Sequence, residues 1–140
     1  TIREVSPYMI ERRWGRIVNL SGGAARMAGS VIGSIRNAGV VALSKNFAME
    51  LGPHGIGVVT VHPGLTYTDD DGPVRLAAAR KPGMTDDEAR RATFENNHLG
   101  RTIYAADVAN IICFLASPKA DPITGDVVTA GGGVGSAIYY

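Results

Sequence analysis

Apolar residues fall into two kinds of pattern along the chain, and these patterns predict its secondary structure. Short continuous apolar runs, rich in β-branched residues, are typical of strands that are buried on both faces of a parallel sheet. Three such runs are found at 16–21, 56–61 and 125–130. Apolar residues at helical spacing predict helices around these runs, over 4–13, 34–51 and 106–115. Strands that alternate with helices indicate an α/β fold with a doubly wound parallel sheet.

The longest predicted helix has a start signal and a stop signal. Ser34 is expected to be its N-cap, because a serine hydroxyl accepts a backbone N–H at a helix start. Gly52-Pro53 ends the helix after Leu51, since neither residue favours a helix interior. The expected bounds are therefore Ser34–Leu51.

The segment from Leu65 to Arg101 is polar, and 69–101 is expected to be an insert within a single partial domain that spans 1–140. Thr85 is followed by three acidic residues, which is typical of a helix start. The insert is therefore predicted to contain two short helices.

Three parallel strands make a thin sheet with exposed edges. The run from Ile17 to Leu20 would leave unpaired backbone groups at one edge unless another strand pairs with it. We therefore expect a further part of the fold to complete the sheet.

Charge and composition argue against several classes of function. The chain has 14 Lys and Arg residues against 13 Asp and Glu, for a formal net charge of +1. This balance gives no strong field to hold nucleic acid or an anionic membrane. No apolar stretch is long enough to span a bilayer, and none has the pattern of a signal peptide. A cytoplasmic location is expected.

The single cysteine, Cys113, cannot form a disulfide within the chain, and this favours a reducing compartment. It lies in the apolar run Ile111–Leu115, so its side chain is expected in the core, where a thiol is inert.

Four groups of residues form an ordered set of motifs. A Trp-Gly-Arg-apolar strand covers Trp14–Ser21, and a helix end with a Gly-Pro-His-Gly turn covers Asn46–Ile56. A Pro-Gly loop with following threonines covers Val61–Thr68, and the last group is 107–117 with 123–125 and 131–132. In this order they resemble the fifth strand, the interface helix, the loop after the sixth strand, and the final helix and strand of the short-chain dehydrogenase/reductase family.

The resemblance covers almost the whole chain and implies the C-terminal half of a Rossmann-type fold, with 69–101 as its substrate loop. The implied activity is hydride transfer between NAD or NADP and an alcohol or ketone. In the family, an N-terminal half carries the Gly-rich turn that holds the pyrophosphate. Gly131–Gly133 follows a strand here, but too little chain follows it to open a helix, so we do not expect it to replace that turn.

The same resemblance assigns residues to the nicotinamide end of the site. Backbone near Leu65 and the side chain of Thr68 would contact the carboxamide, with Leu20, Pro63 and Gly64 beside them. In the alternative interpretation, the Pro-Gly pair only ends a strand and the threonine only forms a turn. No residues are assigned to a metal.

The family's catalytic residues have no counterparts at the corresponding positions. In the family, a Tyr is the general acid/base, a Lys four residues later lowers its pKa, and a Ser holds the substrate oxygen. Alignment on the strand and on Ala38–Lys45 places these positions at Gly33, Asn37 and Gly22, and no Tyr-x-x-x-Lys occurs anywhere in the chain. General acid–base catalysis contributes about 10²–10⁴-fold in rate, so the resemblance implies an impaired oxidoreductase.

Other candidate residues have two interpretations each. His62 is either a replacement acid/base or a residue that satisfies backbone at a strand end. Asp69–Asp71 either binds a cation or is solvated. Arg26, Arg36 and Arg80 are cations suited to an anionic substrate, but the sequence does not place them in a cleft.

Three alternatives to an impaired enzyme stay open: a non-catalytic subunit, a nucleotide-binding module without turnover, and a pseudogene-like fragment that is not stable alone. The first two would assemble with an intact paralogous chain or with an N-terminal half. The resemblance makes Ser34–Leu51 the interface helix of a homo- or hetero-oligomer. Its small residues Ala38, Gly39, Ala42 and Ala48 permit close packing.

Overall fold

Three parallel strands form the centre of the fold, which confirms the prediction from the apolar runs. The computed structural model describes residues 1–134, so the last part of the expected 1–140 domain, residues 135–140, lies outside the described residues. Strand β2 (Ile56–His62) lies between β1 (Gly15–Leu20) and β5 (Val127–Thr129), and both pairings are parallel.

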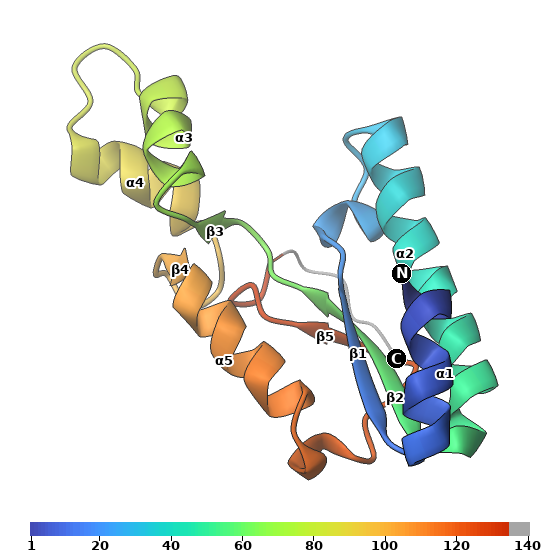
Figure 1. Ribbon diagram of the computed structural model, residues 1–140. Helices are drawn as coiled ribbons and strands as arrows, with labels where there is room; N and C mark the ends of the chain where they lie inside the picture. The colour runs from blue at the N-terminus through green and yellow to red at the C-terminus, as the bar shows by residue number, and fades with distance from the viewer. Residues whose placement is uncertain (135–140) are drawn as a thin grey trace.

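Helices cover both faces of this sheet. Figure 1 shows α1 (Ile2–Arg12) and α2 (Val31–Leu51) on one face and α5 (Ala105–Leu115) on the other. Every residue of β2 is buried. Because side chains along a strand alternate between the two faces, this strand contributes to a core cluster on each side. The clusters contain Ile56, Val58, Ala48 and Leu51 on one face, and Val59, Val61, Val108 and Leu115 on the other.

Helix α2 begins three residues before the predicted start. Its N-cap is Ser30, whose hydroxyl accepts the backbone N–H of Gly33 at 3.1 Å, and the predicted cap Ser34 lies inside the helix. The first turn carries Val31 and Ile32, which are 78% and 80% exposed. The prediction was wrong here because these residues are not on the buried face whose spacing marked the helix.

The polar segment contains two short helices, as predicted. They are α3 (Asp71–Ala79) and α4 (Asp86–Phe94), and Thr85 caps α4 in a reciprocal capping box with Glu88. Figure 1 shows the two helices together beyond one end of the main sheet. A second sheet joins them to the core; its strands, β3 and β4, are Thr66–Tyr67 and Ile103–Tyr104. Short 3-10 turns also occur at Gly23–Ala25 (η1), Gly52–His54 (η2) and Pro118–Ala120 (η3).

Cys113 is exposed, so its expected place in the core was wrong. A continuous apolar run does not show which side of a helix faces the sheet, and in α5 that side carries Val108 and Leu115. Phe114 is 45% exposed on the same helix. No helix within residues 1–134 is both long and apolar enough to cross a membrane.

Strand β1 is an edge strand in the described part of the chain, as the thin sheet predicts. It pairs with β2 alone, and Leu20 at its end is 57% exposed.

Candidate active-site cleft

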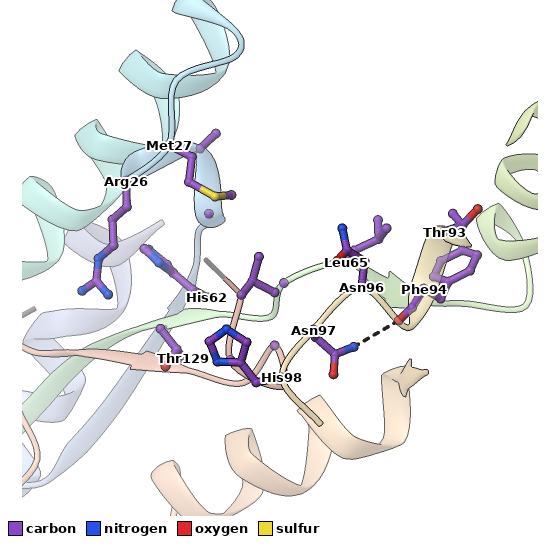
Figure 2. A pocket seen from close by; sticks show the side chains of 16 residues that line it. Arg26, Met27, His62, Leu65, Thr93, Phe94, Asn96, Asn97, His98 and Thr129 are labelled. Carbon is purple, nitrogen blue, oxygen red and sulfur yellow. Dashed lines mark hydrogen bonds between the residues drawn. The ribbon is translucent and has the colours of Figure 1, made fainter. Parts of the chain in front are cut away.

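A cleft of about 520 Å³ opens where the strands of the main sheet end. Its walls come from the loop after β1, the end of β2, the end of α4 with the loop that follows it, and the end of β5 (Figure 2). Ligands of open parallel sheets bind outside the carboxyl ends of the strands. The cleft is therefore where the fold itself favours a ligand.

Glycines make one wall of this cleft by letting backbone segments approach closely. Gly64 has φ 69°, and a Cβ on it would lie 2.6 Å from Cα of Gly131. A Cβ on Gly132 would lie 2.6 Å from Oδ1 of Asn97, and the backbone N–H of His98 donates to the carbonyl of Gly133 at 3.0 Å. The glycine run after β5 thus packs against the loop after α4.

The three positions to which the sequence resemblance assigns the family's catalytic residues, Gly22, Gly33 and Asn37, lie next to one another. The Asn37 side chain donates to the carbonyl of Gly33 at 2.8 Å, and a Cβ on Gly22 would lie 3.3 Å from Oδ1 of Asn37. Asn37 is 9% exposed. These positions offer a buried amide and two glycines where the family has a hydroxyl, a phenol and an ammonium. They adjoin the cleft through Gly23, which lines it.

Ser21 is a residue of this group that sequence reasoning missed. Its hydroxyl donates to the backbone carbonyl of Asn37 at 2.9 Å and lies 3.2 Å from Oδ1 of the same residue. It was treated only as the end of a strand, and its position beside Gly22 was the available signal. The hydroxyl joins β1 to α2, so it is engaged in the fold rather than directed at a ligand.

The residues assigned to the nicotinamide end are only partly brought together. Gly64 and Leu65 line the cleft, whereas Leu20, Pro63 and Thr68 do not. The Pro63 carbonyl accepts the Thr66 hydroxyl at 3.1 Å. Thr68 accepts the backbone N–H of Asp71 at 3.1 Å. This contact is the turn role of the alternative interpretation, and a contact between Thr68 and a carboxamide stays a prediction.

His62 is the most buried titratable side chain of the cleft. It is 4% exposed, and its Nε2 is buried without a hydrogen-bond partner in residues 1–134. Burial in a poorly hydrated site disfavours the charged imidazole and lowers its pKa, and the nearby charge of Arg26 lowers the pKa further. The surroundings of His62 thus favour its neutral form.

Of the three candidate arginines, only Arg26 lines the cleft. Arg36 is exposed on α2, and Arg80 forms an ion pair with Asp86 at 2.9 Å. Within the described residues, no group of three or more His, Cys, Asp or Glu side chains is arranged to hold a metal ion, and Asp71 pairs with Arg75.

Comparison with known proteins decides the family. A family model described as enoyl-(acyl carrier protein) reductase matches residues 1–135. The chain belongs to the short-chain dehydrogenase/reductase family. The family resemblance of the motifs is therefore confirmed.

Curated relatives match at about one third identity. The chain is 35% identical over 128 residues to the 3-oxoacyl-[acyl-carrier-protein] reductase FabG of Aquifex aeolicus, covering 90% of this chain and 47% of that protein. The FabG of Vibrio harveyi is 34% identical over 136 residues, covering 90% and 48%. The chain thus spans about half the length of the curated relatives it matches.

Solved structures agree with this fold. YwfH, an NADPH-dependent reductase involved in bacilysin biosynthesis, superposes with a TM-score of 0.86 at 29% identity, covering 98% of this chain and 53% of that one. A 3-oxoacyl-[acyl-carrier protein] reductase from Brucella melitensis with bound NAD gives a TM-score of 0.74 at 25% identity, covering 96% and 47%.

Proposed function

We propose that this chain is an impaired oxidoreductase that forms the nicotinamide end of an NAD or NADP site. It lacks the acid–base groups with which its family reduces a ketone. The observation that supports this most directly is the contact between Asn37, Gly33 and Gly22, which brings three residues without a titratable group to one point.

The loss matters because hydride transfer to a carbonyl needs a proton for the developing alkoxide. A free tyrosine has a pKa of about 10, so a nearby cation is needed to make it useful near neutrality. Asn37 carries no charge, and its amide is already bonded to the Gly33 carbonyl. Neither glycine has a side chain that could donate or accept a proton.

The proposal places the nicotinamide against the loop after β2, which also forms a structural turn. Gly64 and Leu65 both line the cleft, and the Leu65 side chain is apolar and 40% exposed. A bound nicotinamide would supply the hydride, while the chain would supply the apolar wall and the backbone groups that orient the carboxamide. The reductase from Brucella melitensis has bound NAD in the same fold, which supports a nicotinamide nucleotide as the ligand in this proposal.

A second candidate function, a non-catalytic subunit, is favoured by the outer face of α2. Val31, Ile32 and Ile35 on this helix are 78%, 80% and 69% exposed. Exposed apolar clusters of this kind favour contact with another protein. The partner would be a second copy, an intact paralogous chain or a separate N-terminal half; nucleic acid and membranes are not part of this proposal.

A cytoplasmic location belongs to the same proposal. Cys113 is an exposed free thiol, and a reducing compartment keeps such a thiol from oxidation.

The test of the main proposal is binding of reduced nicotinamide mononucleotide, whose ring is uncharged, followed by amide NMR. Signals of Gly64 and Leu65 should shift on titration. Leu65→Asp should weaken binding about tenfold, which corresponds to about 1.4 kcal/mol, because it replaces an apolar contact with the neutral ring by a carboxylate that must be desolvated. Val74→Asp is the matched control, since Val74 is 64% exposed on α3 and does not line the cleft. Unchanged affinity in Leu65→Asp would contradict the proposal.

A further inference from the structure

The loop after α4 is held in shape by the side chain of Asn97. Its Nδ2 donates to the carbonyl of Phe94 at 3.2 Å and to that of Arg101 at 2.8 Å, and its Oδ1 accepts the backbone N–H of Leu99 at 3.1 Å. Figure 2 marks the bond to Phe94 with a dashed line. A primary amide has two N–H groups, and both are used within this loop, so Asn97 shapes the wall of the cleft rather than binding a ligand.

The two neighbours of Asn97 bring exposed side chains to the cleft. Asn96 and His98 both line it and both are exposed, and neither side chain takes part in the bonds that hold the loop. The Asn96 amide is uncharged, and it can both donate and accept a hydrogen bond. A fixed backbone thus presents a neutral hydrogen-bonding group to the cleft.

The charges of the cleft do not favour a charged ligand. Among the described residues that line it there is no aspartate or glutamate to bind a cation. Arg26 already has a partner in the fold, and burial lowers the pKa of His62, which favours the neutral imidazole. Removing an ion from water without an oppositely charged partner is unfavourable, so this cleft is suited to an uncharged ligand.

Apolar side chains from separate segments line the same cleft. Met27, Leu65 and Val134 are 46%, 40% and 47% exposed, and Figure 2 shows Met27 and Leu65 on different segments of the wall. Phe94 adds a ring that packs edge-on against Tyr67, with ring centroids 5.2 Å apart. The cleft volume of about 520 Å³ exceeds that of one nicotinamide ring and lies within the range of roughly 300–1,000 Å³ that small-molecule sites have.

We infer that the cleft has a second subsite beside the nicotinamide, which takes an uncharged organic ligand. The Asn96 amide binds a carbonyl or hydroxyl oxygen of this ligand, and the apolar part of the ligand lies against Met27 and Val134. The inference deepens the proposed function and rests on it for the place of the nicotinamide. Asn96 thus selects the ligand, because it bonds to an oxygen without adding a charge.

The test compares three ligands on the full chain, with and without reduced nicotinamide mononucleotide. They are the ketone benzylacetone, the similarly shaped anion hydrocinnamate, and acetone, which lacks the phenyl group. Binding is measured from the methyl NMR signals of Met27 and Val134, with Met49 as an internal reference because it does not line the cleft. Benzylacetone should bind about tenfold tighter than either of the others, a difference of about 1.4 kcal/mol. Affinity for hydrocinnamate or for acetone that equals the affinity for benzylacetone would overturn the inference.

Matched variants assign the two contacts. Asn96→Asp should weaken benzylacetone about tenfold, because a carboxylate cannot donate to the ligand oxygen, and Asn46→Asp on α2 should leave the affinity unchanged. Met27→Gln should weaken the ketone by a smaller factor, since less apolar surface is buried, and Met49→Gln should have no effect. Asn96 and Met27 are both exposed, so neither substitution is expected to disturb folding. Unchanged ketone affinity in either cleft variant would overturn the inference.

The same titrations separate this inference from the proposed function. If benzylacetone shifts Met27 and Val134 while the nucleotide leaves Gly64 and Leu65 unchanged, the subsite stands and the proposed function fails. If the nucleotide shifts Gly64 and Leu65 while benzylacetone shifts neither methyl signal in its presence, the proposed function stands and the subsite fails. If neither ligand binds, both fail.

Discussion

His62 and Gly64 lie two residues apart at the end of β2, and different constraints hold them. The imidazole is enclosed, 4% exposed and close enough to Arg26 for that charge to lower its pKa. The glycine keeps φ 69° because its backbone passes directly against Gly131. Both residues line the cleft, so a substitution at either one should change the structure of its wall.

Acid should destabilise the protein through His62. Its pKa in the folded state lies below the ordinary value of 6.5, so below that pH the unfolded chain binds a proton that the folded chain resists. The stability is fully present above the unfolded pKa and is lost as pH falls from there toward the folded pKa. Urea unfolding across this pH range should show a falling free energy of unfolding. In His62→Gln the free energy of unfolding should depend less on pH.

His54→Gln is the control for this experiment, because His54 lies in the η2 turn away from the cleft. Glu88 and Asp107 also have lowered pKa values, from 4.5 and 3.8, so the stability they contribute is lost only at more acid pH. If the free energy of unfolding changes equally with pH in the wild type and in His62→Gln, the predicted lowering of the His62 pKa is wrong.

Gly64→Ala should destabilise the fold by about 1–3 kcal/mol, since it combines a strained positive φ with a clash against backbone. Gly39→Ala is the matched control: a Cβ there meets nothing within 4 Å, so about 0.5–1 kcal/mol of stabilisation is expected from helix propensity. Chemical denaturation of both variants measures this, and a neutral Gly64→Ala would mean that the loop yields easily.

At the scale of elements, sequence patterns predicted the segments that pack in the core and missed the short or exposed segments. Strands β1 and β2 were expected within one residue of their bounds because both are continuous apolar runs. Strands β3 and β4 have two residues each, which is too short to show an alternating apolar and polar pattern. The start of α2 was displaced because its first turn is exposed rather than packed.

The sequence predicted the residues of the cleft only where they belong to one of the family motifs. Gly64 and Leu65 came from the resemblance and do line it. Arg26 was left as one of three candidates, and His98 was not linked to the site. Their segments are far apart in sequence and meet only because β1, β2 and β5 end at the same edge. No local pattern encodes that meeting.

The true start of α2 can be tested by its cap. Ser30→Ala should cost about 0.5–2 kcal/mol of stability, because it removes the acceptor for the Gly33 N–H. Ser34→Ala should be neutral or slightly stabilising, since Ser34 lies inside the helix. Urea unfolding of the two variants gives the comparison, and a larger cost at Ser34 would restore the later start.

At the scale of the whole molecule, two surfaces lack a counterpart in the described residues. One is the open edge of β1, and the other is the outer face of α2. Both lie on elements that also position the cleft, since the loop between β1 and α2 carries Arg26. Assembly and ligand binding are therefore expected to influence each other.

If a second copy covers α2, the wild-type chain should show a native mass that is a multiple of its own. Ile32→Glu combined with Ile35→Glu should reduce it to a single chain, because buried carboxylates oppose association. Val74→Glu on α3 should change nothing. Native mass spectrometry gives the answer, and an unchanged assembly in the double variant would exclude this face.

The central claim is that the chain retains a nicotinamide cleft but not the groups that protonate a reduced carbonyl. The most direct measurement follows the absorbance of NADH and of NADPH while this chain alone is given a β-keto thioester and simple ketones. We predict no oxidation of the nucleotide above the rate without protein. Steady turnover that scales with the chain and falls with Leu65→Asp would contradict the account.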